Sequence, residues 1–204
     1  MDNVQRFYDL VAEREAEDWY PNEMLLPVIR RFIALLPAKP RVLDLGCGTG
    51  HESMRLKNQG ADVVGVDYSA NSIAIAKARN PDIPFHEMDF TFPLDNLGSF
   101  DGIFSSASFV HMQDSQIDTV LAHLKSIHAA GGIFLALFQK GEGRRIHYPE
   151  TNGTTIERII ERHSKESMTG LFARHGYDFI EEVAVPEDPR DIWMCLLFKK
   201  NLQQ

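Results

Sequence analysis

The sequence predicts an α/β sandwich built on a mostly parallel sheet. Between residues 41 and 138, short apolar runs alternate strictly with segments of helical periodicity, the pattern of parallel strands joined by helices. The run 133–138 is apolar without interruption, which suits a strand covered on both faces. The last two runs, 177–185 and 192–198, are joined by a short segment containing Pro186-Glu-Asp-Pro189. That segment is too short for a parallel crossover, so we expect the two strands to pair antiparallel at one edge.

Two helices are expected before the sheet. The first is indicated by apolar residues at positions i, i+3, i+4 and i+7, namely Val4, Phe7, Tyr8 and Val11. The second has an apolar face formed by Leu25, Val28, Phe32 and Leu36, and Pro27 is expected near its start or at a kink. Pro37 and Pro40 end this helix and lead into the first strand.

The remaining elements follow in order along the chain. Strands are expected at 41–45, 62–67, 85–88, 100–105 and 133–138. Helices are expected after Gly50, from a cap at Ser69 to about residue 80, and from Ser115 until Gly131-Gly132 stops it. Residues 139–165 are charged and poorly periodic, and such a long insertion is usually functional or mobile. A helix over 167–174 precedes the final strand pair.

A glycine-rich turn and an acid carry the clearest functional signal. The turn lies in Arg41-Val-Leu-Asp-Leu-Gly-Cys-Gly-Thr-Gly50, and the acid ends the next strand, Val63-Val-Gly-Val-Asp67. Glycines let the backbone turn sharply and approach a ligand closely, and an acid at that strand end can accept two hydrogen bonds from a ribose diol. Together they predict a pocket for a cofactor that contains adenosine. The dehydrogenase fingerprint would place its last glycine at His51, so the spacing argues against a nicotinamide cofactor.

Composition bounds the class of protein. The 204 residues suffice for one domain with a sizeable core, and the net charge of −8 argues against a general nucleic-acid binder. Cys47 and Cys195 offer neither a disulfide framework nor a metal-ligand spacing, which fits a reducing compartment. The N-terminus lacks the pattern of a secretory signal, and no window approaches the roughly 18 apolar residues of a membrane span. We therefore expect a cytoplasmic protein without a metal, membrane or nucleic-acid partner, either a monomer or a homodimer.

These motifs resemble those of the class I S-adenosylmethionine-dependent methyltransferases. The residues that carry the resemblance are Val42-Leu-Asp-Leu-Gly-Cys-Gly-Thr-Gly50, Val66-Asp67-Tyr68-Ser69, Glu87-Met88-Asp89-Phe90, Phe100-Asp101, Gly131-Gly132 and Phe172-Ala-Arg-His-Gly-Tyr177. The resemblance implies a three-layer Rossmann-like sandwich with a seven-stranded sheet in the order 3-2-1-4-5-7-6, strand 7 antiparallel, preceded by N-terminal helices. It further implies one methyltransferase domain over 1–204, S-adenosylmethionine as methyl donor, S-adenosylhomocysteine as product and a small-molecule acceptor.

The resemblance also implies a set of cofactor-binding residues. Asp44 is expected near the methionine amine, Tyr68 along the adenine ring, and Asp89 with the Phe90 backbone at the adenine edge. The full set of candidates is Tyr20, Asp44, Gly46, Cys47, Gly48, Gly50, Asp67, Tyr68, Ser69, Met88, Asp89, Phe90, Ser105 and Ser106.

The acceptor is expected on the other side of the cofactor. His111 is the candidate general base, because an unperturbed imidazole titrates near pH 6.5, and a role in shaping the cofactor pocket is the alternative. By resemblance, residues 1–38 form a helical lid and residues 139–166 a substrate-side insertion. The candidate substrate residues in these segments are Tyr8, Arg144, Arg145 and His147. The paired arginines could clamp a carboxylate or phosphate, whereas a solvated loop is the alternative.

Two other functions are compatible with the sequence. A binder of S-adenosylmethionine without catalysis would share every cofactor motif, because a fold does not fix a function. A protein methyltransferase is equally compatible with the motifs. Methylation of adenine or cytosine amines is disfavoured, because Ser105-Ser-Ala-Ser-Phe109 stands where that branch of the family has an Asn/Asp-Pro-Pro-aromatic motif.

Overall fold

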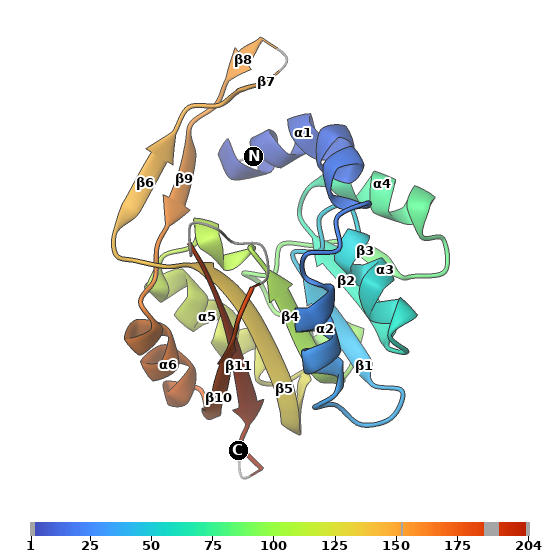
Figure 1. Cartoon of the computed structure of the whole chain (residues 1–204), viewed down its shortest axis with the longest axis vertical. Helices are drawn as coiled ribbons and strands as arrows, with labels where there is room; N and C mark the ends of the chain where they lie inside the picture. The colour runs from blue at the N-terminus through green and yellow to red at the C-terminus, as the bar shows by residue number, and fades with distance from the viewer. Residues whose placement is uncertain (1–2, 152, 186–191, 203–204) are drawn as a thin grey trace.

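The computed structural model describes residues 3–151, 153–185 and 192–202 and arranges them in three layers around a seven-stranded sheet (Figure 1). The strands of this sheet are β1 (Arg41–Leu45), β2 (Asp62–Asp67), β3 (Phe85–Glu87), β4 (Phe100–Ser106), β5 (His128–Gln139), β10 (Tyr177–Val183) and β11 (Trp193–Lys200). The helices are α1 (Asn3–Trp19), α2 (Leu26–Ile33), α3 (His51–Asn58), α4 (Ala70–Arg79), α5 (Asp114–Leu124) and α6 (Lys165–Arg174), with two 3₁₀ turns, η1 (Asp95–Leu97) and η2 (Phe109–His111).

The strand order confirms the expected topology. Across the sheet the order is β3-β2-β1-β4-β5-β11-β10, which becomes 3-2-1-4-5-7-6 when only the strands of this sheet are numbered along the chain. Strands β1 to β5 are parallel to one another, and β11 is antiparallel to both β5 and β10. The Pro186-Glu-Asp-Pro189 segment that led to this antiparallel prediction lies outside the described residues.

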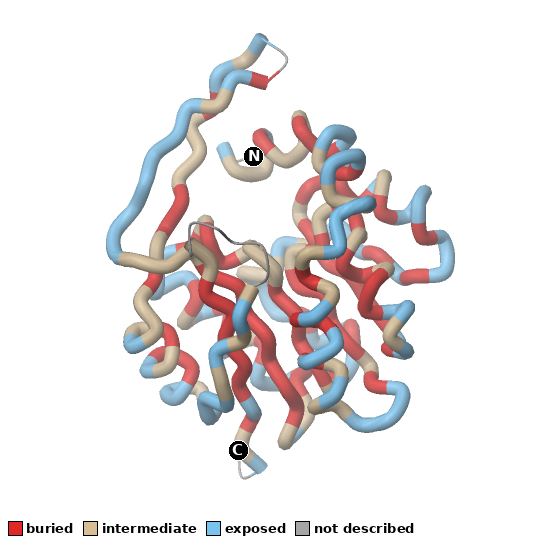
Figure 2. The backbone as a smooth tube through the Cα atoms, in the orientation of Figure 1, coloured by how far each residue is buried: buried red, intermediate tan, exposed pale blue. Residues whose placement is uncertain are grey.

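Two apolar clusters, one on each face of the sheet, hold the layers together. On β5, Phe134, Ala136 and Phe138 belong to the cluster that includes α5 and α6, while the intervening residues belong to the cluster that includes α2, α3 and α4. This alternation is the period-2 geometry of a strand covered on both faces, and Figure 2 shows the central strands buried. Fully burying one such side chain contributes about 1.5–3 kcal/mol.

The prediction that Gly131-Gly132 ends a helix is wrong. Helix α5 already ends at Leu124, and β5 begins at His128, so both glycines lie inside this strand. The pairing of β4 with β5 shifts register between Phe100 and Gly102, opposite this part of β5, and a bulge of that kind favours glycine. A Cβ on Gly132 would lie 2.6 Å from His128 Nε2.

The segment after β5 folds into an arm rather than an irregular loop. Strand β6 (Arg144–His147) pairs with β9 (Arg158–Glu161), and β7 (Glu150–Thr151) pairs with β8 (Thr154–Thr155). The arm projects beyond the sheet, and β6 is exposed along its length (Figures 1 and 2). Its strands are short and contribute little to the core, so they lack the burial pattern that predicts a strand from sequence.

Helix α1 lies above the edge of the sheet where the parallel strands end, between the arm and α4 (Figure 1). It contacts α4 on one side and β9 on the other. Phe7 and Val11 of the predicted apolar face are buried, and together with Ile156 they form a small separate cluster. Among the described residues, no helix combines the length and the apolar character needed to cross a bilayer.

Candidate active site

A cavity of about 420 Å³ opens beneath α1, at the carboxyl ends of the parallel strands. This volume lies within the range of small-molecule sites, and ligands of open α/β sheets bind at this edge. The predicted residues that line it are Tyr8, Asp44, Gly46, Cys47, Gly48, Asp67, Tyr68, Asp89, Phe90, Ser106 and His111. Within the described part of the chain, no group of three His, Cys, Asp or Glu side chains is arranged to hold a metal ion.

Two glycines of the turn differ in their surroundings: Gly46 is packed against Ser108, whereas Gly48 borders the cavity. Gly46 has a φ of +76°, and a Cβ there would lie 2.3 Å from Ser108 Oγ. Gly48 has a φ of +51° and borders the cavity, and a Cβ there would meet no atom within 4 Å. Both positions have left-handed backbone that favours glycine, and only Gly48 leaves room for a ligand to approach.

The amides of this turn are engaged within the protein. Gly46 N and Cys47 N donate to Val66 O at 2.8 and 2.9 Å, and Gly48 N donates to Asp67 Oδ2 at 2.9 Å. A ligand carboxylate therefore finds no free donor in these three groups. The first turn of α3 follows directly, and helix N-termini carry amides without intrahelical partners.

Asp67 lies at the end of β2 with its carboxylate held by backbone amides. Its Oδ2 accepts from Gly48 N, and its Oδ1 accepts from Ser69 N at 2.8 Å. Burial raises the pKa of this carboxyl, while the amides of Ser69, Gly48 and Tyr68 oppose that rise. A carboxylate has about four acceptor sites, so capacity remains for a further donor from the cavity.

Asp44 and Glu52 form an acidic end of the cavity. Asp44 is buried on β1 and accepts a hydrogen bond from Ser53 Oγ, and burial raises its pKa to about 7. Burial likewise raises the pKa of Glu52 to about 7, with nearby Arg55 opposing the shift. Glu52 Oε2 is buried without a hydrogen-bond partner among the described residues. Such carboxyls favour a cationic ligand group, which would stabilise their ionised forms.

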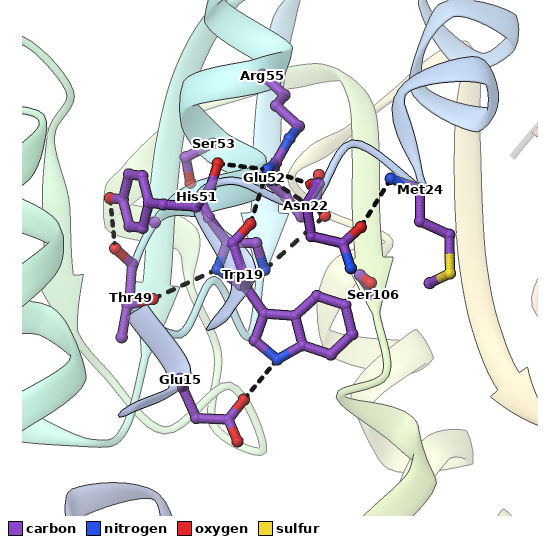
Figure 3. A network of polar contacts seen from close by, with 12 residues as sticks. Glu15, Trp19, Asn22, Met24, Thr49, His51, Glu52, Ser53, Arg55 and Ser106 are labelled. Carbon is purple, nitrogen blue, oxygen red and sulfur yellow. Dashed lines mark hydrogen bonds and ion pairs between the residues drawn. The ribbon is translucent and has the colours of Figure 1, made fainter. Parts of the chain in front are cut away.

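Figure 3 shows how the end of α1 is fixed over this acidic end. Trp19 Nε1 donates to Glu15 Oε2 at 2.9 Å, and the indole stacks on His51 with ring centroids 6.1 Å apart. Arg55 Nη2 donates to the carbonyls of Trp19, Tyr20 and Asn22, which anchors the connector between α1 and α2 on α3.

A second polar group lies at the other end of α1 and joins three distant parts of the chain. Tyr8 from α1 and His111 from η2 are linked by a 3.0 Å contact between Tyr8 Oη and His111 Nε2. Arg158 Nη2, from β9, donates to Tyr8 Oη at 2.9 Å. His111 Nδ1 lies 2.8 Å from Ile159 O, which can only accept, so Nδ1 carries the proton in the neutral imidazole and Nε2 accepts from Tyr8.

Several predicted residues do not reach the cavity. Tyr20 supports the glycine turn instead, because its hydroxyl donates to Thr49 O at 2.8 Å and accepts from Asn80. Ser105 is fully buried and bonded to Ser108, and Gly50 is packed against Phe85. The predicted residues absent from the cavity wall are Tyr20, Gly50, Ser69, Met88, Ser105, Arg144, Arg145 and His147.

The predicted arginine clamp is among the residues that the fold keeps apart from the cavity. Arg144, Arg145 and His147 lie on β6 and are exposed, and Arg144 pairs with Glu161 across the hairpin at 2.9 Å. The basic residue that does line the cavity is Arg158, on the partner strand β9. Sequence reasoning missed Arg158, since nothing local distinguishes it from the other arginines of the arm.

Ser69 acts as a structural residue in this arrangement. Its hydroxyl accepts from Ser72 N at 3.1 Å, which caps α4 as predicted, and donates to Asp9 Oδ1 of α1 at 2.6 Å. We expect Ser69→Ala to lose about 1–2 kcal/mol of stability. In a chain of this size that loss lowers the melting temperature by about 2–8 °C, measurable by differential scanning calorimetry. The control is Ser115→Ala, at an exposed position in α5, and equal melting of the two variants would contradict the role of Ser69.

The fold is a Rossmann-like sandwich with a cavity beside its glycine turn, and comparison with known proteins shows what the chain is similar to. Residues 42–132 match the family model described as a methyltransferase domain. The chain is 41% identical over 96 residues to a magnesium-protoporphyrin O-methyltransferase of Rhodobacter capsulatus. That match covers 44% of this chain and 42% of the relative, so less than half of the relative's length is spanned.

Solved structures extend the likeness to almost the whole chain. DhpI in complex with S-adenosylhomocysteine superposes with a TM-score of 0.79 at 18% identity, over 98% of this chain and 96% of that chain. The 1,6-didemethyltoxoflavin-N1-methyltransferase of Burkholderia thailandensis, solved with 1,6-didemethyltoxoflavin and S-adenosylhomocysteine, gives 0.77 at 17% identity, over 98% of this chain and 88% of that chain. Residues 42–132 therefore match a methyltransferase domain, and the chain shares the fold of these two solved structures.

Proposed function

We propose that this protein transfers the methyl group of S-adenosylmethionine to a small-molecule acceptor. The observation that carries the proposal is the cavity itself, which brings the glycine turn, Asp67 and the Tyr8–His111 pair to one place beneath α1. The magnesium-protoporphyrin and 1,6-didemethyltoxoflavin methyltransferases named above act on small molecules by their descriptions, and both solved structures named above hold S-adenosylhomocysteine. The domain is proposed to act in the cytoplasm, because both cysteines are free and buried.

The groups that line the cavity are complementary to the parts of this cofactor. Asp67 can accept from the ribose hydroxyls, and Gly48 leaves open space where the cofactor passes. The acidic end at Asp44 and Glu52 suits the methionine ammonium, and the unpartnered Glu52 Oε2 is a buried acceptor there. Tyr68 and Phe90 border the cavity as apolar surfaces for the adenine ring, with Asp89 beside them.

The residues of this chain supply placement and proton handling. When bound, S-adenosylmethionine supplies an electrophilic methyl group on a sulfonium. Residues 1–38 are proposed to close over the cavity and exclude water, and residues 139–166 to form its substrate side. Holding the acceptor atom about 3–3.5 Å from its target, in line, is the main catalytic contribution. His111 Nε2, presented through Tyr8, is proposed to accept a proton from acceptors that must lose one.

Calorimetry and product detection test this proposal. We expect heat of binding with both S-adenosylmethionine and S-adenosylhomocysteine, and accumulation of S-adenosylhomocysteine only when a small-molecule cell extract is added. Tight binding without product from small molecules or from protein extract would instead indicate a non-catalytic binder. Absence of heat with both compounds would reject the proposed function, and product formed only with protein extract would indicate a protein methyltransferase.

The acidic end predicts that cofactor affinity rises with pH. The pKa of Asp44 is about 7 in the free protein, raised mainly by burial, so the carboxyl is largely protonated at pH 5.5 and largely ionised at pH 8. An ammonium group binds the ionised form, so the affinity for S-adenosylhomocysteine should increase about tenfold or more between pH 5.5 and 8. Isothermal titration calorimetry across this range measures the change.

Two controls isolate the cause of this pH dependence. 5′-Methylthioadenosine lacks the amino-acid end, so its affinity should change little over the same range. Asp44→Asn should weaken binding at pH 8 and make the pH profile less steep, with the remaining slope due to Glu52. A profile for Asp44→Asn as steep as that of the unchanged protein would contradict the assignment of the acidic end.

A further inference from the structure

We infer that Arg158 recognises an anionic group, a carboxylate above all, on the methyl acceptor, and so restricts the substrates to small organic acids. This inference rests on the proposed function and names the class of acceptor that the cavity admits. It is carried by the charge distribution of the cavity wall, by the unmet hydrogen-bonding capacity of the guanidinium, and by its position next to His111.

Arg158 is the one lysine or arginine on the cavity wall within the described part of the chain. Five acids share that wall: Glu15, Asp44, Glu52, Asp67 and Asp89. Arg158 nevertheless forms no ion pair within 4 Å with any described carboxylate, whereas Arg144 on the neighbouring strand pairs with Glu161. A partly buried cation without a counter-ion is unfavourable, and an anionic ligand would supply the missing charge.

The guanidinium retains donors for such a ligand. Of its five N–H groups, one on Nη2 is used by Tyr8 Oη, and Nε is buried with no hydrogen-bond partner in the described structure. The guanidinium carbon lies 4.8 Å from the centre of the Phe7 ring and 5.6 Å from that of Tyr8. These rings attract the cation through their faces but accept no strong hydrogen bond. The planar fork of arginine matches the two oxygens of a carboxylate.

The position of Arg158 assigns it to the acceptor rather than to the cofactor. Tyr8 Oη touches both Arg158 Nη2 and His111 Nε2, so an acid held by Arg158 lies beside the candidate base. Trp19, which covers the acidic end, is eleven residues further along α1, about 16 Å at 1.5 Å per residue. The amino-acid end of the cofactor, expected at Asp44, therefore lies at the opposite end of α1 from Arg158.

The competing explanation is a purely structural role. Arg158 also joins β9 to α1 through Phe7 and Tyr8, so its loss could simply loosen the arm. A structural role would lower thermal stability and cofactor affinity together and would not distinguish acidic acceptors from neutral ones. If Arg158 recognises an anion, its substitution raises the acceptor concentration needed for half-maximal rate and leaves cofactor affinity unchanged.

The test uses methyl transfer into separated acceptor pools. A small-molecule cell extract is divided by anion exchange into a retained, anionic fraction and an unretained fraction, and each is incubated with the full-length protein and radiolabelled S-adenosylmethionine. We expect label in the retained fraction. Arg158→Gln should raise the amount of that fraction needed for half-maximal rate by about 100-fold, and Arg158→Lys, which keeps the charge but not the fork, by about tenfold. Arg174→Gln, an exposed arginine on α6, is the matched control and should behave as the unchanged protein.

Each other outcome overturns the inference in a recognisable way. Label confined to the unretained fraction would show that acceptors are not acids. A tenfold loss of S-adenosylhomocysteine affinity in Arg158→Gln would assign the arginine to the cofactor's own carboxylate. If Arg158→Gln fails to fold, Arg158→Lys decides. If that variant reaches half-maximal rate at the same acceptor concentration as the unchanged protein and melts at the same temperature, the guanidinium has no role in recognition. Binding of S-adenosylhomocysteine without transfer into either fraction would overturn the proposed function, and this inference with it.

Discussion

Replacing Asp67 with alanine is expected to weaken the binding of S-adenosylhomocysteine at least 100-fold. The carboxylate is proposed to accept two hydrogen bonds from the ribose, and hydrogen bonds to a charged group contribute about 1.5–3 kcal/mol each. Alanine also leaves the Gly48 and Ser69 amides without their present acceptor, so the glycine turn itself loses a support. Isothermal titration calorimetry at pH 8 measures the affinity, and circular dichroism confirms that the variant is folded.

Asp62 provides the matched control for Asp67. It starts the same strand, β2, but lies exposed at the opposite end, 3.8 Å from Arg41 Nε across a weak surface ion pair. Asp62→Ala should leave the affinity unchanged. Asp67→Asn keeps the volume and one acceptor oxygen, and should fall between the alanine variant and the unchanged protein. An affinity of Asp67→Ala within threefold of the unchanged protein would refute the ribose assignment.

The sheet was predictable because its buried strands are encoded by short runs of apolar residues. Val42, Leu43 and Leu45 alternate between the two apolar clusters, and such runs stand out against the amphipathic helices that separate them. The antiparallel edge followed from the short connection between the last two strands. The strands of the arm could not be predicted in this way, because β6 is exposed throughout and has no alternation of buried and exposed residues.

The proposed cofactor half of the cavity was more predictable than the proposed acceptor half, because its residues are close in sequence. Gly46, Gly48 and Asp67 lie on adjacent parallel strands and the turn after the first, so their spacing in sequence is fixed by the βαβ unit. Arg158 and Tyr8, in contrast, are 150 residues apart and meet only because the arm folds back onto α1. No local pattern encodes that meeting, which is why the sequence pointed to Arg144 and Arg145 instead.

The Tyr8–His111 contact refines the role expected for the histidine. Since Ile159 O fixes the proton on Nδ1, the lone pair on Nε2 is the basic site, and it is occupied by the Tyr8 hydroxyl. Burial raises the pKa of Tyr8, with Arg158 opposing that rise, so the phenol stays protonated near neutral pH. An acceptor proton can therefore reach Nε2 either by displacing Tyr8 or by passing through its hydroxyl.

Substituting His111 with alanine is accordingly expected to lower kcat by about 10²–10⁴ for an acceptor that must lose a proton, the usual contribution of a general base. Affinity for S-adenosylhomocysteine should change by less than threefold, because Asp67 and the glycine turn remain in place. Tyr8→Phe removes the hydroxyl and keeps the ring. If the proton passes through Tyr8, this variant should lose activity as His111→Ala does, and if Tyr8 is displaced it should lose far less.

The comparison of kcat with affinity decides between the two roles of His111. His86→Ala, an exposed histidine on β3, controls for the loss of an imidazole and should leave both quantities unchanged. A pH profile of kcat that loses its lower limb in His111→Ala would identify the imidazole as the titrating base. Parallel loss of kcat and of S-adenosylhomocysteine affinity would instead make His111 a wall of the cofactor pocket, and proton removal would then fall to the solvent or to the acceptor's own acidity.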